Sequence, residues 1–252
     1  MPTIVEKPKI VLPTKKSEID NNWRSQKIGM IGAPGIGKSE FWSYGEHTLF
    51  IQTEAGLNHL SVFKVPVRCW DDFVELYTVL IQSHNSGTLQ YDTIIMDTVD
   101  NFANFANQES IARGRAKFKN IDINTVGDIP NGAGWMWATE LVENSFSKLE
   151  QLNACIVYVG HLDTKEIKTP TSSIHKKTIS LGGKMGQFLL SWPDHLLHID
   201  ATIQQSGNVK RMIRTLPSQT LDAKSRGGMV QDGWLWGDST KDNYIKFRAL
   251  FK

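Results

Sequence analysis

The segment Gly32-Ala33-Pro34-Gly35-Ile36-Gly37-Lys38-Ser39 constrains this chain more than any other part of its sequence. It has the spacing Gly-x4-Gly-Lys-Ser, follows an apolar strand predicted over 28–31, and opens a helix predicted over 38–44. Glycines in such a turn let backbone N–H groups point inward around phosphate oxygens, where the helix dipole also favours anions. We therefore predict a phosphate-binding loop. The alternative is an ordinary glycine-rich turn between a strand and a helix.

The end of this loop is predicted to hold a nucleotide and its metal ion. The Lys38 ammonium would bridge the β- and γ-phosphates, and the Ser39 hydroxyl would bind Mg²⁺. Glu40 follows directly and is included in the predicted nucleotide site. The predicted cofactors are therefore ATP and Mg²⁺, held by residues 32–40.

Short apolar strands alternate with amphipathic helices from residue 27 onward, which is typical of a mainly parallel sheet flanked by helices. Further strands are predicted over 48–52, 65–67, 93–97 and 155–159, and helices from 71, through 102–106, over 135–152 and around 188–190. An antiparallel hairpin is predicted from 195–203 and 210–216, across a turn at 206–208. Residues 1–22 lack apolar periodicity, so they are predicted to be an extended tail before one domain at 23–252.

Two carboxylates follow predicted strands at the edge of the sheet that carries the phosphate loop. Asp97 ends the most apolar strand, where an acidic residue can bind Mg²⁺ directly or through water. Its alternative role is to cap the next helix. Glu54 follows the strand at 48–52 and could orient and deprotonate an attacking water. Its alternative is a solvated loop residue.

His161 follows the strand predicted at 155–159, so its side chain could sense the γ-phosphate and signal to the polar loop expected after it. A packed, hydrogen-bonded core histidine is the alternative. Lys224 and Arg226 lie in a glycine-rich turn late in the chain. Such cations could reach a neighbouring subunit's γ-phosphate and neutralise developing charge, or they could be a solvated basic turn.

Two basic segments, both predicted as loops, are suited to binding a polyanion. They contain Arg113, Arg115, Lys117 and Lys119 in the first segment and Lys165, Lys168, Lys176, Lys177 and Lys184 in the second. Both come after strands that end near the predicted nucleotide site, so ATP could order them and change their grip on phosphates. Basic loops that are merely solvated are the alternative.

Composition limits the remaining possibilities. The 28 Lys and Arg against 26 Asp and Glu give a formal charge of +2, so a nucleic-acid partner requires clustered charge. Cys69 and Cys155 each lie in an apolar stretch and are predicted core residues, which favours a reducing compartment over a disulfide framework. No apolar run approaches the roughly 20 residues of a membrane span, so we expect a cytoplasmic protein without a membrane partner.

Taken with their context, these residues resemble the compact, phage-type members of the RecA-like ATPases. Such proteins consist of the RecA core alone and are associated with single-strand annealing and recombination. A strand-ending glutamate before the aspartate strand favours this class over other families with a phosphate loop. The matching segments are 31–39, 49–57, 94–100, 156–161, 183–184 and 223–226.

The resemblance implies a RecA-like P-loop NTPase fold and a role for each candidate residue. Glu54 takes the place of the catalytic glutamate, and the two basic segments take the places of the DNA-contacting loops. Lys224 and Arg226 resemble the Lys-x-Arg pair with which RecA-like hexameric helicases complete a neighbour's active site. RecA itself usually carries glutamine where this chain has His161.

The function predicted on this basis is an ATPase, stimulated by DNA, that binds single-stranded DNA and promotes annealing or recombination in phage DNA metabolism. The expected partners are single-stranded DNA, further copies of the chain in a ring or filament with shared active sites, and a cognate single-strand-binding protein. Two alternatives stay open: a phosphotransferase acting on a small molecule or nucleotide, and a nucleotide-gated scaffold for replication proteins that does not hydrolyse ATP.

Overall fold

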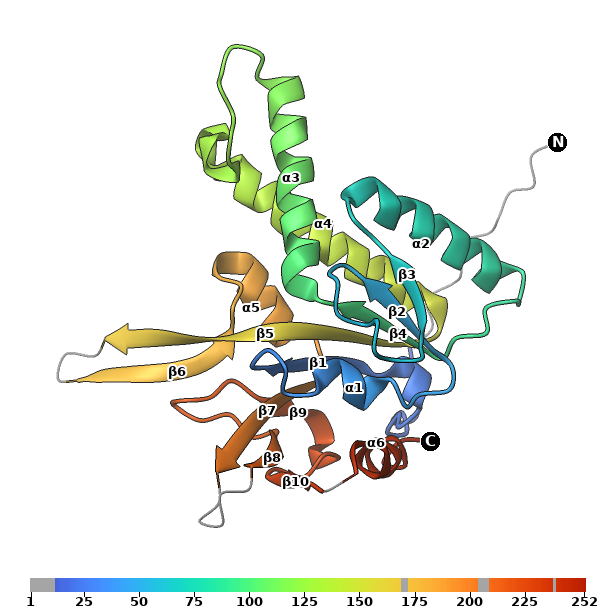
Figure 1. Ribbon diagram of the computed structural model, residues 1–252. Coiled ribbons are helices and arrows are strands. Elements are labelled where there is room, and N and C mark those ends of the chain that lie inside the picture. The colour runs from blue at the N-terminus through green and yellow to red at the C-terminus, as the bar shows by residue number, and fades with distance from the viewer. Residues whose placement is uncertain (1–11, 169–171, 204–208, 238) are drawn as a thin grey trace.

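A mainly parallel sheet forms the centre of the molecule (Figure 1). The computed structural model describes residues 12–168, 172–203, 209–237 and 239–252. The strands of these residues are β1 (Lys27–Gly32), β2 (Thr48–Gln52), β3 (Phe63–Pro66), β4 (Thr93–Asp97), β5 (Cys155–Lys168), β6 (Ser173–Ile179), β7 (His195–Ile203), β8 (Val209–Arg214), β9 (Lys224–Ser225) and β10 (Trp234–Trp236).

The strand order is β10-β8-β7-β1-β5-β4-β2-β3, with β6 paired to β5 and β9 paired to β7. Neighbours from β7 to β3 along this order run parallel, whereas β7, β8 and β10 pair antiparallel. The predicted fold class is confirmed: a mainly parallel sheet flanked by helices, with an antiparallel C-terminal hairpin. The turn predicted at 206–208 lies outside the described residues.

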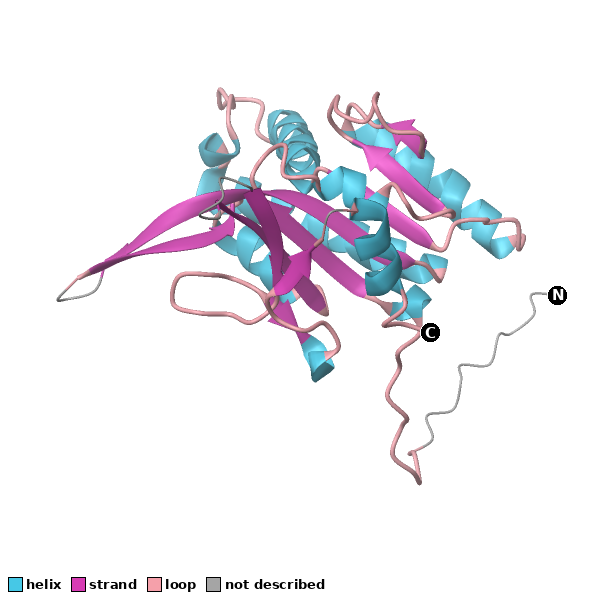
Figure 2. Ribbon diagram, turned by 60° about the horizontal axis from the view of Figure 1, so that its bottom comes forward, coloured by secondary structure: helices cyan, strands magenta, loops and turns pink. Residues whose placement is uncertain are grey.

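Helices cover both faces of this sheet (Figure 2). They are α1 (Lys38–Trp42), α2 (Trp70–Asn85), α3 (Val99–Lys117), α4 (Ala133–Leu149), α5 (Gly183–Ser191) and α6 (Thr240–Arg248). Short 3-10 segments occur at Trp23–Ser25, Val126–Asp128, Pro130–Gly132, Glu150–Leu152 and Arg226–Gly228. The helices α2 to α5 pack on one face, and α1 and α6 pack on the other.

The central strands are buried on both faces, which explains their continuous apolar character. Along β4, Ile94 and Met96 pack with α2 to α4, while Ile95 between them packs on the opposite side with Phe41 of α1. Gly29 of β1 lies beneath the Tyr158 ring, where a Cβ would overlap that ring. A side chain at position 29 would therefore push the strands β1 and β5 out of their packing.

The prediction of a polar loop after His161 is wrong. The strand β5 continues to Lys168 and pairs with β6, so that the two form a long hairpin that projects from the body of the molecule (Figure 1). Apolar residues face each other across it in the Leu162–Ile179 and Ile167–Ile174 pairs. Strand pairing therefore outweighs the many charges from which a loop was predicted.

The first basic segment is mostly helix, because α3 extends to Lys117 and carries Arg113 and Arg115, and only Lys119 lies in the turn after it. On the same stretch of helix, Ile111 is buried together with Ile123 and Ile129. This small cluster keeps the chain helical beyond the predicted end. Likewise, Lys184 lies in the first turn of α5.

Three further expectations need correction. The turn predicted around Lys224 is a short strand, β9, followed by a 3-10 turn at Arg226. Cys69 is exposed, because it occupies the position just before α2, whereas Cys155 is buried as predicted. The helix predicted over 135–152 begins two residues earlier, at Ala133, and its last turn is 3-10.

The chain enters the domain beside its C-terminal end. The Trp23 N–H donates to the carbonyl of Lys252 at 3.0 Å, and the Lys252 N–H donates to the carbonyl of Asn21 at 2.9 Å. The predicted boundary between residues 22 and 23 stays a prediction. None of the helices in the part of the chain that the structure describes combines the length and apolarity needed to cross a bilayer.

Candidate nucleotide site

The carboxyl ends of β1, β2, β4 and β5 meet at one edge of the sheet, as expected for parallel strands. Register brings Gly32 beside His161 and Gln52 beside Asp97. A cavity of about 280 Å³ opens at this edge. Its lining includes Lys38, Ser39, Glu40, Glu54, Asp97 and His161, so the structure brings together the residues that the sequence predicted for the nucleotide site.

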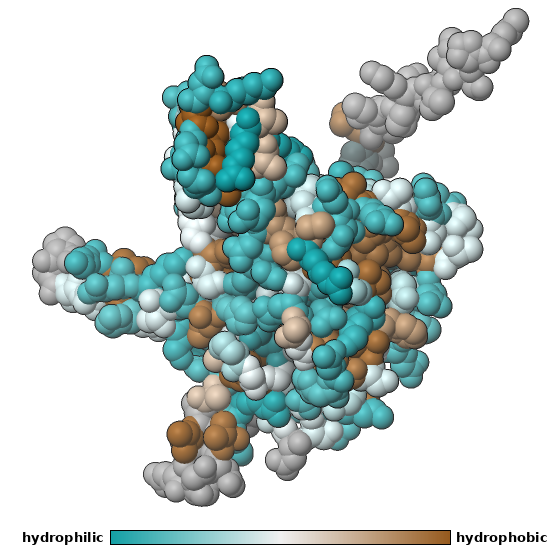
Figure 3. All heavy atoms as spheres, turned by 45° about the horizontal axis from the view of Figure 1, so that its top comes forward, coloured by the Kyte–Doolittle hydropathy of each residue, from teal (hydrophilic) through white to brown (hydrophobic). Residues whose placement is uncertain are grey.

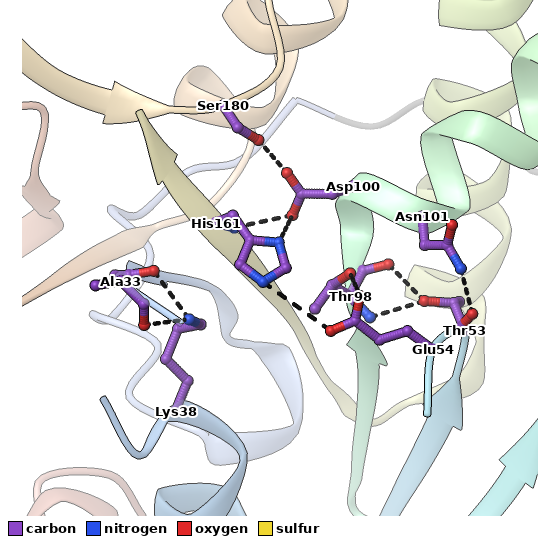
Figure 4. A network of polar contacts seen from close by, with 10 residues as sticks. Ala33, Lys38, Thr53, Glu54, Thr98, Asp100, Asn101, His161 and Ser180 are labelled. Carbon is purple, nitrogen blue, oxygen red and sulfur yellow. Dashed lines mark hydrogen bonds and ion pairs between the residues drawn. The ribbon is translucent and has the colours of Figure 1, made fainter. Parts of the chain in front are cut away.

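The phosphate loop leads directly into α1, with Gly37 in a left-handed conformation at φ 98°. Lys38 is buried, and its Nζ donates to the carbonyls of Gly32 and Ala33, each at 2.9 Å (Figure 4). Burial lowers the pKa of the Lys38 ammonium, and the nearby carboxylates of Asp97, Asp100 and Glu54 oppose that shift. The ammonium therefore lies inside the loop and can exchange these carbonyls for phosphate oxygens.

Asp97 ends β4 and is only 4% exposed. Burial raises the pKa of its carboxyl, while a hydrogen bond with Ser39 and the charge of Lys38 oppose the rise. Its Oδ2 atom has no hydrogen-bond partner among the described residues. A buried carboxylate oxygen beside a serine hydroxyl suits a hard divalent cation, so these residues fit a magnesium site.

Glu54 follows β2 and is held by two neighbouring segments. Its Oε2 accepts a hydrogen bond from the Thr98 hydroxyl at 3.3 Å, and its Oε1 lies 4.0 Å from His161 Nε2 (Figure 4). Thr53 fixes the backbone here, because its hydroxyl accepts from the Thr98 N–H at 2.7 Å. The side chain of Glu54 is 43% exposed, so water can reach it. Its role as a base stays a prediction.

Asp100, in the first turn of α3, belongs to this network and was missed from the sequence. Its Oδ2 accepts from the His161 N–H at 2.8 Å and lies 3.3 Å from His161 Nδ1. Ser180, just after β6, donates to the other oxygen. The available signal was an acidic residue in the first turn of the helix after Asp97, a position that suits the helix dipole.

Lys224 and Arg226 lie at the opposite end of the strands, near the first residues of β1 and β7. Lys224 Nζ donates to the Ser191 carbonyl at 2.8 Å, and the Arg226 guanidinium pairs with Asp194 at 2.7 Å. The Asp194 N–H in turn donates to the carbonyl of Lys27, the first residue of β1. Since β1 spans roughly 16 Å from this point to the phosphate loop, the structure does not bring this pair into the chain's own site.

Many of the predicted DNA-binding cations have partners within the fold. In the first segment, Arg113 pairs with Glu109 at 2.7 Å, Arg115 donates to the Ile123 carbonyl, and Lys117 lies over the Trp137 ring. Three others, Lys119, Lys168 and Lys184, are exposed.

On the β5–β6 hairpin, Lys176 pairs with Asp222 at 2.6 Å and Lys177 with Asp200 at 3.1 Å. Lys165 Nζ donates to the Leu181 carbonyl at 3.2 Å. Hydrophilic side chains predominate on this hairpin and on the projection formed by α3 and α4, which also carries an apolar strip (Figure 3). DNA binding by these residues stays a prediction.

A protein-family model described as "AAA domain" matches residues 24–227, about four fifths of the chain. The chain belongs to this AAA-domain family. In the sheet, β5 lies between the phosphate-loop strand β1 and the Asp97 strand β4. Together with the family match, this order confirms the predicted RecA-like P-loop NTPase class.

Among curated proteins, the chain is similar to the "SPbeta prophage-derived uncharacterized protein YorG" of Bacillus subtilis (strain 168), with 26% identity over 136 residues. The match covers 53% of this chain and 40% of that protein, so the chain spans about two fifths of this relative's length.

Two solved structures are similar in outline. The KaiC-like protein PH0186 of Pyrococcus horikoshii OT3 is 9% identical, with 86% of this chain and 87% of that chain covered and a TM-score of 0.45. The flagellar accessory protein FlaH of Methanocaldococcus jannaschii is 12% identical, with coverages of 75% and 77% and a TM-score of 0.38.

Proposed function

We propose that this protein binds and hydrolyses ATP with Mg²⁺ at the edge of the sheet where β1, β2, β4 and β5 end. One observation carries the proposal: Lys38 at the start of α1, Glu54 after β2 and Asp97 at the end of β4 line a single cavity, and one oxygen of Asp97 has no hydrogen-bond partner among the described residues. Ser39 and Asp97 would hold Mg²⁺, which when bound would neutralise charge on the β- and γ-phosphates.

In the proposed reaction each side chain has a distinct task. Lys38 pairs with the β- and γ-phosphate oxygens, and backbone N–H groups of the loop surround the remaining ones. Glu54 accepts the proton of the water that attacks the γ-phosphate. His161 reports the state of that carboxylate, since it lies between Glu54 and Asp100.

The second part of the proposal is that single-stranded DNA binds on the two projections and stimulates hydrolysis. A cavity of about 300 Å³ between the starts of α4 and α5 supports it. Trp135, 60% exposed, lines this cavity together with Met136 and Lys184. An exposed aromatic ring beside a cation suits a stacked base with its phosphate.

The route from the nucleotide to the proposed DNA site is short. The strand β5 passes from Val159 and His161 in the nucleotide cavity straight into the projecting hairpin. Asp100 joins the two strands of the hairpin at their base, because it contacts His161 on one and Ser180 after the other. A change at the γ-phosphate would therefore reach both strands of the hairpin.

We further propose assembly into a ring or filament, in which Lys224 and Arg226 serve a neighbour's site, and a role in annealing or recombination of phage DNA in the host cytoplasm. The location of this pair at the far edge supports a shared site, and the similarity to a prophage-derived protein supports a phage setting. A cognate single-strand-binding protein is a further proposed partner.

A phosphotransferase is the less favoured alternative. Such enzymes close an arginine-bearing lid over a second substrate, a role for which Arg113 and Arg115 can be considered. Both lie 14 or more residues along α3 from its start at the site, which is roughly 20 Å. A scaffold that does not hydrolyse ATP is the other alternative. A measured ATP turnover would exclude it, and ATP binding without turnover would support it.

The test is ATP binding and turnover, measured across protein concentrations with and without single-stranded DNA. We expect turnover that rises with DNA and with protein concentration, and Lys38→Ala should abolish tight ATP binding in calorimetry because the loop loses its buried cation. Tight binding by Lys38→Ala would refute the phosphate site. Binding without turnover would support the scaffold, and turnover that requires a small acceptor would support the phosphotransferase.

A further inference from the structure

A guanidinium from the C-terminal hairpin lies directly against the phosphate loop. Arg211 of β8 donates from Nη1 to the Ile36 carbonyl at 3.2 Å, and the same nitrogen lies 3.8 Å from Glu40 Oε2. A Cβ placed on Gly37 would overlap Nη1. Residue 211 is separated from the loop by 175 positions, so the contact exists only in the folded chain.

The Arg211 side chain is itself held in place. Its guanidinium lies 4.6 Å from the centre of the Trp236 ring, which belongs to the facing strand β10 and is only 4% exposed. The Trp236 ring packs edge-on against Phe41 of α1 at 5.1 Å. The cation therefore bridges the hairpin and the helix that follows the phosphate loop.

The geometry points to Arg211 as a positioning residue for the phosphate loop. The Ile36 carbonyl and the Gly37 N–H share one planar peptide group and point in opposite directions. Because Arg211 binds that carbonyl from outside the loop, the Gly37 N–H is turned to the inner side, where the cavity lies. An N–H fixed in this direction is ready to donate to a β-phosphate oxygen.

Arg211 also governs the charge next to the anion site. Glu40 lies in the first turn of α1 and lines the nucleotide cavity, so its carboxylate would repel a polyphosphate. The Arg211 guanidinium, 3.8 Å from the Glu40 carboxylate, offsets that charge. Arg211 thus orders the loop and screens Glu40 without touching the nucleotide. This inference rests on the proposed nucleotide binding and adds a residue outside the phosphate-loop motif.

The experiment compares nucleotide affinity and turnover in four variants of the full chain. Arg211→Ala should raise the Kd for ATP and for ADP by the same factor, about 10-fold or more, the scale of losing a hydrogen bond to a charged group. The kcat at saturating ATP should change little, because the lost interaction is equal in the ground and transition states. Arg211→Lys should recover part of the affinity, and Glu40→Gln in the Arg211→Ala background should recover the part due to charge.

Arg214→Ala is the matched control, since Arg214 lies on the same strand but pairs with Asp232. It should lower Tm without raising the Kd. Equal Kd changes in Arg211→Ala and Arg214→Ala would overturn the inference in favour of general hairpin stability, and a fall in kcat at unchanged Kd would place Arg211 in the chemistry instead. If Lys38→Ala abolishes binding while Arg211→Ala leaves it intact, the inference fails and the proposed function stands.

Discussion

The two ends of the parallel sheet carry the two sets of residues that the sequence marked as catalytic or metal-binding, and the two sets differ in what holds them. At the carboxyl end, Lys38 at the start of α1, Glu54 after β2 and Asp97 at the end of β4 line one cavity. At the amino end of β1, Lys224 and Arg226 lie on the surface beside Asp194.

The difference follows from strand direction. Parallel strands bring their final residues to one edge, however far apart they are in the chain, so Glu54 and Asp97 meet the phosphate loop. The short strand β9 runs antiparallel to β7 and pairs with its first residues, His195 and Leu196. Residues that end β9 are therefore carried to the other end of the strands, away from the chain's own nucleotide site.

The largest expected effect tests whether Arg226, at the amino end of the strands, completes the active site of a neighbouring subunit. Arg226→Ala should keep ATP binding and lose most turnover, by about 10³- to 10⁵-fold, because an arginine supplied in trans meets charge that develops only in the transition state. The measurements are calorimetry for binding and phosphate release for turnover.

Mixing sharpens this result. With excess Glu54→Gln protein, Arg226→Ala protein should regain some activity, since a mixed interface pairs the intact Glu54 of one with the intact Arg226 of the other. Mixtures that co-assemble by light scattering but show no rescue would leave Arg226 as a surface charge held by Asp194.

The next effect tests the carboxyl end. Glu54→Gln should leave ATP binding nearly intact and slow turnover by roughly 10²-fold or more, since a general base contributes about 10²- to 10⁴-fold. Glu46→Gln, at an exposed turn before β2, is a control of the same chemistry. Unchanged turnover in Glu54→Gln would make Glu54 a structural partner of Thr98.

Strand β7 contains a buried histidine, and we expect its protonation to change the free energy of unfolding. His198 of β7 is fully buried, and neither ring nitrogen has a partner among the described residues. Burial lowers its pKa to about 4. The unfolded chain, with a pKa near 6.5, binds this proton first, so stability is complete above about pH 6.5 and falls as the pH drops toward 4.

His198→Leu should remove this part of the pH dependence, which amounts to about 3 kcal/mol in the limit. Urea unfolding at pH 7.5 and at pH 5 measures it, with the exposed His175→Asn as the control. If His198→Leu and the parent lose the same unfolding free energy between pH 7.5 and pH 5, His198 is not buried in the neutral form.

The smallest effect concerns the projections beyond the carboxyl end. Lys176→Ala with Lys177→Ala should weaken single-stranded DNA binding and flatten its salt dependence by up to about 1.4 in the slope of log affinity against log salt. Lys241→Ala with Lys246→Ala removes the same charge from two exposed positions on α6 as a control. Equal slopes in both double variants would leave these lysines to their partners Asp222 and Asp200.

The sequence by itself determined the phosphate loop and the strand ends that face it. The spacing of residues 32–39 and the apolar runs before Glu54, Asp97 and His161 are local signals. Because the carboxyl ends of parallel strands lie together, these signals predict that the residues share one site. No knowledge of distant pairing is needed for this step.

Only the tertiary structure decided the rest, because each missed feature depends on pairing between segments that no local pattern signals, and two of the contacts join segments that are remote in the chain. The β5–β6 hairpin depends on one strand finding its partner, the Asp100–Ser180 contact spans 80 residues, and the Arg211–Ile36 contact spans 175. The sequence around a charged or polar residue does not indicate such a partner. The composition of an apolar run, by contrast, is enough to predict that the run is buried.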